Sequence, residues 1–176
     1  MPQAGGVRAV FLVGFMGAGK TSVGRVLARR LGWRFEDLDD RIQTRTGRSI
    51  AEIFLESGEA EFRRIENSAL RDLLSELSTG HCIVGLGGGA LLTAENRALI
   101  ESSHARVVFL DGPVDELFRR CQQEQRVRPL LQAAKRFRDL YEQRRACYET
   151  ASCRIDSAGK DVDTVATEVA CSLGLD

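Results

Sequence analysis

Several features are scarce in this sequence, and each shortage excludes a class of protein. The 25 basic and 25 acidic residues cancel, so no overall charge points to nucleic acid, to an acidic partner or to a membrane surface. No apolar run approaches the roughly 18 residues of a membrane span. The first residues also lack the apolar core of a signal peptide. We therefore expect a cytoplasmic protein that binds neither nucleic acid nor a membrane.

Cysteine and histidine offer little metal or disulfide chemistry. The five cysteines are scattered, odd in number and never spaced as C-x-x-C, so we expect reduced thiols in a reducing compartment. The two histidines, His81 and His104, have no plausible metal-ligand partner nearby in the sequence. We assign both histidines to structural or surface roles.

The size and composition are those of one globular unit. A chain of 176 residues, 43% apolar and 28% charged, is long enough for a sizeable core and too ordinary for a disordered or fibrous protein. We found no internal repeat, low-complexity tract or linker. The expectation is a single domain over residues 1–176, present as a monomer.

The most informative stretch present is Gly14-Phe15-Met16-Gly17-Ala18-Gly19-Lys20-Thr21. It fits the pattern G-x-x-x-x-G-K-[ST], with a strand-like apolar run before it and a helical pattern after it, which is the context this motif requires. Backbone N–H groups of such a loop cradle phosphates, Lys20 reaches the terminal phosphates, and the Thr21 hydroxyl ligates Mg²⁺. The alternative is a glycine-rich turn that carries an incidental lysine.

Apolar β-type runs alternate with helix-period segments along the whole chain. This alternation predicts an α/β fold with a parallel sheet covered on both faces. The predicted strands are residues 8–13, 34–38, 81–86, 106–110 and 153–156. The predicted helices follow the glycine-rich loop and cover residues 49–55, 59–77, 95–103, a segment opened by Pro113, 137–148 and 162–173.

Two carboxylates follow the second predicted strand. Because side chains alternate along a strand, Asp37 and Asp39 should leave one face together, at the sheet edge where ligands of open α/β folds bind. In the alternative reading they are a helix N-cap and a first-turn acid, a role that Asp40 also fits.

Three further segments carry candidate binding groups. Arg63 and Arg64 lie on the predicted helix 59–77, about 100° apart around its axis, so they cannot share a role. Three glycines, residues 87–89, follow a buried strand and leave backbone that a ligand can approach closely. Residues 121–134 are polar and basic and contain Arg128-Pro129, and we interpret them as a mobile lid.

Together these segments resemble one family. The segments that carry the resemblance are the loop at residues 14–21, the run Asp37-Leu38-Asp39, the segment around Phe62-Arg63, the glycine triplet, Arg128-Pro129-Leu130, and Arg144-Arg145-Ala146 before Tyr148. In these segments the chain resembles shikimate kinases over almost its full length. The resemblance implies transfer of the ATP γ-phosphoryl group to the 3-hydroxyl of shikimate, a step toward chorismate and the aromatic amino acids. It also implies a three-layer α/β/α P-loop kinase fold, with a five-stranded parallel sheet in the order 2-3-1-4-5 and a lid.

The resemblance also implies roles for individual residues. The catalytic residues would be Lys20, Asp39 and Arg128. Asp39 would contact the shikimate hydroxyls and take the proton of the attacking one, and Arg128 on the lid would close onto the ATP phosphates. Shikimate would be bound by Asp39, Arg63, Gly88 and Arg145. In that set the two arginines grip the carboxylate, and the Gly88 backbone donates to the ring.

ATP and Mg²⁺ are the implied co-substrate and cofactor. The implied nucleotide-binding residues are Gly17, Ala18, Gly19, Lys20, Thr21, Ser22, Arg120 and Arg128. Arg120 resembles the arginine that stacks against adenine. Thr21 would ligate Mg²⁺ directly, and Asp37 would hold it through water.

The resemblance has departures and leaves alternatives. Gly85 stands where many family members have a small polar residue, and the lid matches no fixed family pattern. One alternative is a sister small-molecule kinase, which would have to explain why Arg63 and Arg145 accompany the two aspartates. The other is a catalytically silent homologue that serves as a nucleotide-binding module.

Overall fold

A computed structural model describes residues 7–125 and 131–175. The strands in this part of the chain are β1 (Ala9–Val13), β2 (Arg34–Asp37), β3 (Cys82–Gly85), β4 (Arg106–Asp111) and β5 (Cys153–Asp156). The α-helices are α1 (Lys20–Leu31), α2 (Leu38–Thr46), α3 (Ile50–Glu76), α4 (Ala94–Ser102), α5 (Val114–Gln125), α6 (Leu131–Tyr148) and α7 (Val162–Leu173). Short 3-10 helices η1 (Leu77–Thr79) and η2 (Ala90–Leu92) complete the described elements.

The five strands form one parallel sheet in the order β2-β3-β1-β4-β5. The central strand is β1, in which Phe11 pairs with Val84 of β3 on one side and Val107 of β4 on the other. Every residue of β1 is buried, as expected of an unbroken apolar run in a sheet covered on both faces. The predicted fold and strand order are confirmed.

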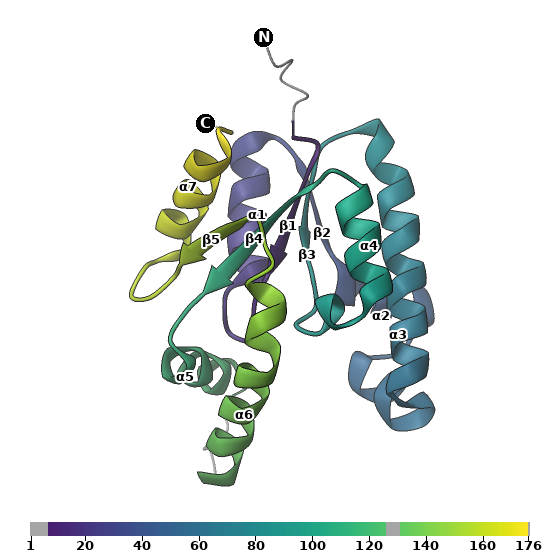
Figure 1. Cartoon of the computed structure of the whole chain (residues 1–176), viewed down its shortest axis with the longest axis vertical. Helices are drawn as coiled ribbons and strands as arrows, with labels where there is room; N and C mark the ends of the chain where they lie inside the picture. Colours follow the sequence, from purple (N-terminus) through teal and green to yellow (C-terminus); the bar gives the residue numbers. More distant parts are fainter. Residues whose placement is uncertain (1–6, 126–130, 176) are drawn as a thin grey trace.

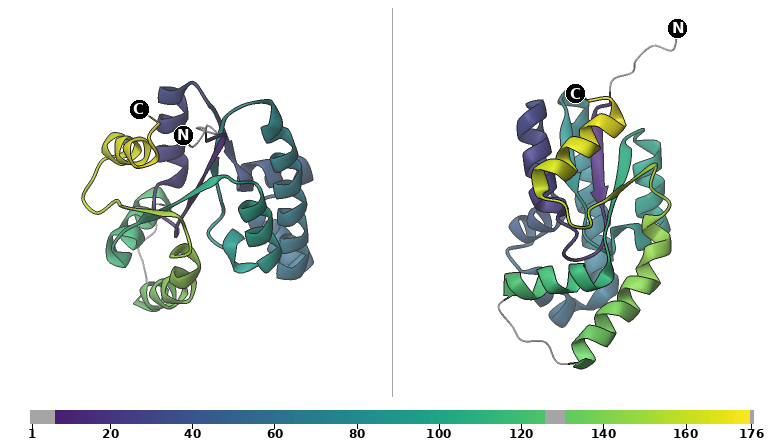
Figure 2. Two further views of the ribbon diagram at one scale, coloured as in Figure 1. Left: turned by 45° about the horizontal axis from the view of Figure 1, so that its top comes forward. Right: turned by 90° about the vertical axis from the view of Figure 1, so that its left-hand side faces the viewer.

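Helices form a layer on each side of the sheet. Helices α1 and α7 pack against each other over one face, and α3 and α4 pack over the other (Figures 1 and 2). All five strands run in the same direction, so their carboxyl ends meet at one edge, the lower one in Figure 1, where α5 and α6 lie. Ligand sites of open α/β sheets form at this edge.

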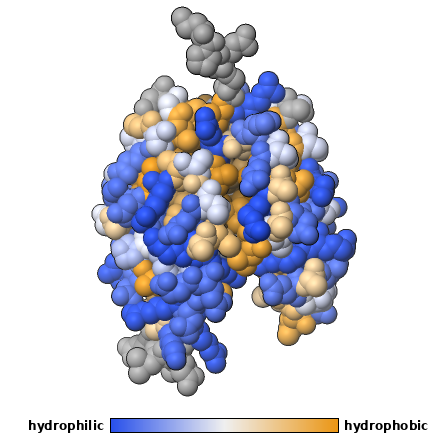
Figure 3. All heavy atoms as spheres, viewed as in Figure 1, coloured by the Kyte–Doolittle hydropathy of each residue, from blue (hydrophilic) through white to orange (hydrophobic). Residues whose placement is uncertain are grey.

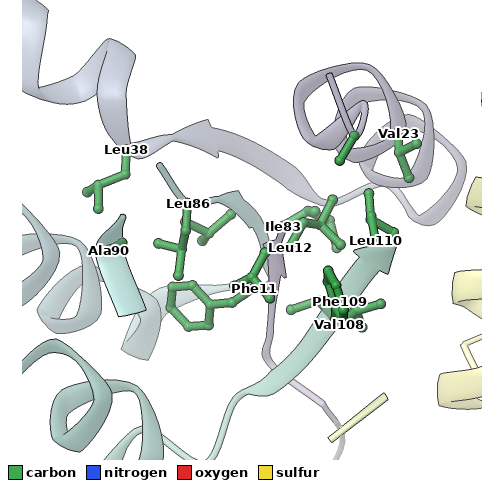
Figure 4. Close-up of a cluster of buried hydrophobic side chains, with 14 of the residues drawn as sticks. Phe11, Leu12, Val23, Leu38, Ile83, Leu86, Ala90, Val108, Phe109 and Leu110 are labelled. Atoms are coloured by element: carbon green, nitrogen blue, oxygen red, sulfur yellow. The ribbon is translucent and has the colours of Figure 1, made fainter. Parts of the chain in front are cut away.

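A single apolar cluster holds the layers together. Figure 4 shows Phe11 and Leu12 of β1 gathered with Ile83 of β3 and with Phe109 of β4, and all four are at most 1% exposed. Each fully buried side chain of this kind contributes about 1.5–3 kcal/mol to folding. This core fixes the strand ends from which the site residues project.

Local signals in the sequence set where the helices start and end. Gly32 adopts the left-handed conformation that closes α1, with φ 66°. Ser49 and Glu52 form a reciprocal capping box at the start of α3. Gly58, with φ 80° and ψ 173°, interrupts α3 and separates its short first part from the long amphipathic part.

Two local predictions need correction. Strand β2 ends at Asp37, and α2 begins at Leu38, so Asp39 lies in the first helical turn and is not part of a strand. The predicted lid at residues 121–134 is also partly helical, since α5 continues to Gln125 and α6 begins at Leu131. The centre of that lid, with Arg128, lies outside the described residues.

None of the described helices is both long and apolar enough to cross a membrane.

Candidate active site

The glycine-rich loop joins β1 to α1 at the carboxyl edge of the sheet. Gly17 and Gly19 have φ of 79° and 85°, a left-handed conformation that glycine adopts without steric cost. Gly19 is the N-cap residue of α1, so the loop delivers the positive end of that helix to its concave side. A Cβ at Gly17 would lie 3.1 Å from the Cys121 sulfur of α5, which shows how closely α5 covers the loop.

Lys20 folds back over this loop. Its Nζ donates to the carbonyl oxygens of Gly14 at 2.8 Å and Phe15 at 3.1 Å. Burial lowers the pKa of Lys20 to about 8, although the nearby Asp39 and Asp37 carboxylates act in the opposite direction. The ammonium group therefore remains mostly protonated at neutral pH, held where phosphate oxygens would replace the two carbonyls.

Asp37 has both of the roles between which the sequence left a choice, a carboxylate at the ligand site and the N-cap of a helix. Its Oδ1 caps α2 by accepting from the backbone N–H groups of Asp39 and Asp40. Its Oδ2 accepts from the Thr21 hydroxyl at 2.8 Å, which joins the end of β2 to the first turn of α1. A hydroxyl and a carboxylate side by side are hard oxygen donors of the kind that Mg²⁺ prefers. The two residues therefore fit the predicted metal site.

Asp39 reaches the loop from α2, because the cap turns the chain at Asp37. Burial raises the pKa of Asp39 to about 6, and the neighbouring Asp37 and Glu66 carboxylates add to the shift. Its Oδ1 is buried and has no hydrogen-bond partner among the described residues. A carboxylate with a free, buried acceptor and a raised pKa is suited to accept a proton from a hydroxyl group.

The glycine triplet at residues 87–89 brings three charged side chains together. A Cβ at Gly87 would lie 2.8 Å from Asp39 Oδ1, and a Cβ at Gly88 would lie 3.3 Å from Nη1 of Arg144. A Cβ at Gly89 would overlap the guanidinium of Arg63. The triplet is therefore free of side chains so that groups from α2, α3 and α6 can approach its backbone.

Arg63 is held by Glu66, an acid that the sequence pattern did not single out. Glu66 is fully buried on α3 and accepts from Arg63 Nη1 at 2.8 Å and from Asn96 Nδ2 at 3.2 Å. Burial raises the pKa of Glu66, against the effect of Arg63. The i,i+3 spacing of Arg63 and Glu66 was a visible signal, but such pairs are common on exposed helices. Arg64 instead pairs with Glu61 on the exposed side of α3.

The structure distinguishes the two arginines of α6. Arg145, the residue predicted to hold the substrate carboxylate, pairs with Asp111 and Glu149 and is not among the nearest neighbours of a Cβ at Gly88. Arg144 faces the triplet and the Phe15 ring, and its Nε is buried without a hydrogen-bond partner among the described residues. Four residues later on the same helix face, the Tyr148 hydroxyl donates to the Gly88 carbonyl oxygen. The arginine beside Gly88 is therefore Arg144.

The glycine-rich loop also lines a cavity of about 510 Å³. It is lined by Gly17, Ala18, Gly19, Ser22, Val23, Arg120, Gln123, Ser157, Lys160, Asp161, Val162 and Val165. Arg120 donates to the Gly17 and Ser157 carbonyl oxygens and pairs with Glu116, so the predicted adenine-stacking arginine does line this cavity. The segment after β5 also lines the cavity, which its sequence alone was too weakly patterned to show.

The carboxyl edge of the sheet, to which the glycine-rich loop and the glycine triplet belong, lies at a hollow in the molecular surface (Figures 1 and 3). The space-filling view shows the lower edge of the molecule indented between two lobes, one formed by α5 and α6 and the other by the start of α3 (Figure 3). The described residues contain no cluster of three or more histidine, cysteine or acidic side chains able to hold a metal, at this edge or away from it. His81 lies against the Trp33 ring, with centroids 4.7 Å apart, which is a structural role.

Comparison with known proteins gives a consistent answer. A family model described as shikimate kinase matches residues 16–173. The shikimate kinase of Geobacter metallireducens is 43% identical over 93% of this chain and 90% of that protein. The Persephonella marina shikimate kinase is 36% identical over 93% of this chain and 97% of that protein.

Solved structures agree with these relatives. The Acinetobacter baumannii shikimate kinase in complex with shikimate superposes with a TM-score of 0.84, at 35% identity over 97% of this chain and 96% of that one. The Aquifex aeolicus shikimate kinase gives a TM-score of 0.78, at 33% identity over 94% of this chain and 96% of that one. With a phosphate-binding loop, an acid and two inward-facing arginines at one sheet edge, this chain is a small-molecule kinase that belongs to the shikimate kinase family.

Proposed function

We propose that this protein transfers the γ-phosphoryl group of ATP to the 3-hydroxyl of shikimate, giving shikimate 3-phosphate and ADP. The observation that carries the proposal is the convergence of Asp39, Arg63 and Arg144 on the glycine triplet, beside the glycine-rich loop. One acid and two cations suit a ligand that combines hydroxyl groups with a carboxylate. Family membership supports the same substrate.

Shikimate would be held by its carboxylate and by its hydroxyl groups. Arg63 and Arg144 come from different helices and would form the carboxylate clamp, with Arg144 in the place that the sequence reading gave to Arg145. Each charged hydrogen bond is worth roughly 1.5–3 kcal/mol, so two arginines provide both affinity and orientation. The Gly88 backbone N–H remains the proposed donor to the ring, since the Gly88 carbonyl is already bound by Tyr148.

The phosphoryl transfer step then needs positioning and charge neutralisation. Asp39 accepts the proton of the 3-hydroxyl as that oxygen bonds to the γ-phosphorus and the bond to the ADP oxygen breaks. Lys20 and the backbone N–H groups of the loop stabilise the charge on the phosphate oxygens. Arg128 is the proposed lid arginine that closes on the same phosphates, and it lies outside the described residues.

ATP would occupy the cavity bounded by the loop, Arg120 and the segment after β5. Its phosphates would lie along Gly17, Ala18 and Gly19, with Ser22 at the first turn of α1. Thr21 and Asp37 would hold Mg²⁺, which, when bound, supplies positive charge at the β- and γ-phosphate oxygens. Thr21 is already oriented for this by its hydrogen bond to Asp37.

The organisation and location of the protein are part of the proposal. We propose one domain over residues 1–176, supported by the single core cluster that spans all five strands of the described sheet. None of the five cysteines forms a disulfide in the described part of the chain, and we propose a cytoplasmic location. A monomer is proposed as well, and light scattering after size exclusion would test it.

The direct test is ADP release from ATP and Mg²⁺ on addition of shikimate. Stimulation by shikimate, without stimulation by gluconate or a nucleoside monophosphate, is the expected result. Stimulation by one of the latter would identify a sister kinase instead. ATP binding without shikimate binding at millimolar concentration, measured by calorimetry, would favour a catalytically silent homologue.

A further inference from the structure

A second charged cluster lies at the carboxyl end of β4, outside the set of residues assigned above. Its centre is Asp111, a carboxylate only 5% exposed. Arg145 of α6 donates to both oxygens of Asp111, at 3.1 and 3.0 Å, and the Tyr141 hydroxyl donates to Oδ1 at 3.3 Å. Arg154 of β5 pairs with Oδ2 at 2.6 Å. A buried carboxylate with this many partners holds several elements at once.

The same residue is also tied to the nucleotide side. The Asp111 carbonyl oxygen accepts from the Ser157 backbone N–H and from the Ser157 hydroxyl, both at 2.7 Å. Ser157 lines the cavity assigned to ATP. The Asp111 side chain accepts in addition from the Gly112 N–H at 2.9 Å, which fixes the turn between β4 and α5. The end of β4 is therefore a rigid support for whatever the Asp111 carboxylate holds.

What the carboxylate holds is one face of α6. Tyr141 and Arg145 are four residues apart, share a face, and both contact Asp111. Arg144 and Tyr148 are also four residues apart and share the face that meets Gly88. Adjacent residues are about 100° apart around a helix. Holding Arg145 on Asp111 thus determines the direction in which Arg144 points.

We propose that Asp111 is a positioning residue for the kinase reaction: it sets the rotation of α6 through Arg145 and Tyr141, and so directs Arg144 toward the substrate carboxylate. The inference rests on the proposed function for the identity of the substrate. Asp111 itself contacts none of the residues of the glycine triplet by any hydrogen bond that the described structure contains. Its effect on the reaction is transmitted by α6.

The charges around Asp111 support a role in orientation. Hydrogen bonding to Asp111 raises the pKa of Arg145 above its ordinary value. Burial and the Asp111 carboxylate also raise the pKa of Tyr141, which therefore stays protonated and keeps donating. The pair is bidentate, a geometry that fixes the guanidinium plane as well as its distance. A helix face held in this way resists rotation.

The test compares three single substitutions by kinetics and calorimetry. Asp111→Asn and Arg145→Gln should each raise the KM and the Kd for shikimate about 10-fold, the effect of weakening one charge-assisted hydrogen bond. The KM for ATP should change less than about twofold in both, because the glycine-rich loop and the Asp111 backbone carbonyl that binds Ser157 are the same in both variants. Arg154→Gln is the matched control, since Arg154 pairs with the same carboxylate from β5 and its side chain is 59% exposed. That variant should keep both KM values.

A merely structural role for Asp111 would give a different result. It would lower the melting temperature while leaving the shikimate KM of the folded fraction unchanged, or it would raise both KM values alike, and either outcome overturns the proposal. If Asp111→Asn fails to fold, Arg145→Gln carries the same test. In an Arg144→Ala background, Asp111→Asn should change the shikimate KM less than about twofold, and an undiminished 10-fold effect there would also overturn it.

Failure of the proposed function is separable from failure of this inference. A wild-type protein without shikimate-dependent ADP release would refute the substrate assignment alone. Amide hydrogen exchange does not depend on activity. Asp111→Asn and Arg145→Gln should speed exchange in the last two turns of α6 relative to α7. Exchange in α6 equal to that of the wild type in both variants would refute the anchoring of α6.

Discussion

The nucleotide side and the substrate side of this site differ in how their residues are brought together. On the nucleotide side, residues 14–21 are contiguous, and the glycine conformations and Lys20 contacts are set within that one loop. On the substrate side, Asp39, Arg63 and Arg144 come from α2, α3 and α6 and meet only at the glycine triplet. A local motif thus binds the common co-substrate, and a tertiary assembly selects the acceptor.

This difference predicts that substitutions on the substrate side change catalysis or shikimate binding and leave ATP binding unchanged. The largest effect should come from Asp39→Asn, which removes the proton acceptor and lowers kcat by about 10²–10⁴. ATP affinity, measured by calorimetry, should stay nearly the same. Asp40→Asn, on the exposed side of the same helical turn, is the control. Near-normal turnover of Asp39→Asn would show that Asp39 only positions the substrate.

The two arginines of α6 give the next largest effect and the sharpest contrast. Arg144→Ala should raise the KM for shikimate about 100-fold, since it removes charged hydrogen bonds to the carboxylate. Arg145→Ala should raise it only about 10-fold, because Arg145 acts through the orientation of α6. Arg63→Ala should resemble Arg144→Ala. The reverse order for Arg144 and Arg145 would restore the assignment made from the sequence.

The glycine triplet should be sensitive to a single added methyl group. Gly87→Ala would place a Cβ 2.8 Å from Asp39 Oδ1, which forces the carboxylate to shift. We expect about a 10-fold loss in kcat/KM for shikimate, of the order that a small misplacement of a catalytic group produces. Gly80→Ala is a matched control, because that glycine is extended and a Cβ there meets nothing within 4 Å. Equal activity of both variants would contradict the close approach of Asp39.

The smallest effect near neutral pH is a pH dependence from the raised pKa of Asp39, about 6. Below this pH the carboxyl is protonated and cannot accept a proton, so kcat/KM for shikimate should halve near pH 6 and then fall about 10-fold per unit. The effect on stability has the opposite sign. Because the folded state binds this proton more tightly than the unfolded chain, the Asp39 term should increase stability as pH falls from about 6 to about 4.

The contrast between the two sides also explains how much the sequence could predict. Apolar runs, capping residues and glycines act over a few residues, so strand order, helix ends and the phosphate-binding loop followed from pattern and resemblance. The strand alternation argument for Asp39 was wrong because Asp37 caps α2 and turns the chain one residue earlier. The two carboxylates still lie next to each other, but because of this helix cap and not because of strand alternation.

The choice between Arg144 and Arg145 was beyond any local pattern. Both are arginines, adjacent on one helix, and the face that each occupies depends on the contact between Arg145 and Asp111, which are 34 residues apart in sequence. The same holds for Glu66, whose burial under Arg63 depends on Asn96 of α4. Long-range packing decides these orientations, and a single sequence does not display it.

The central claim is that two arginines hold the carboxylate of a hydroxylated substrate beside the phosphate-binding loop. The most direct measurement compares kcat/KM for shikimate and for its methyl ester, which keeps the 3-hydroxyl and lacks the charge. A loss of about 100-fold or more with the ester is expected from the missing charged hydrogen bonds. Equal kcat/KM values for acid and ester would contradict the claim.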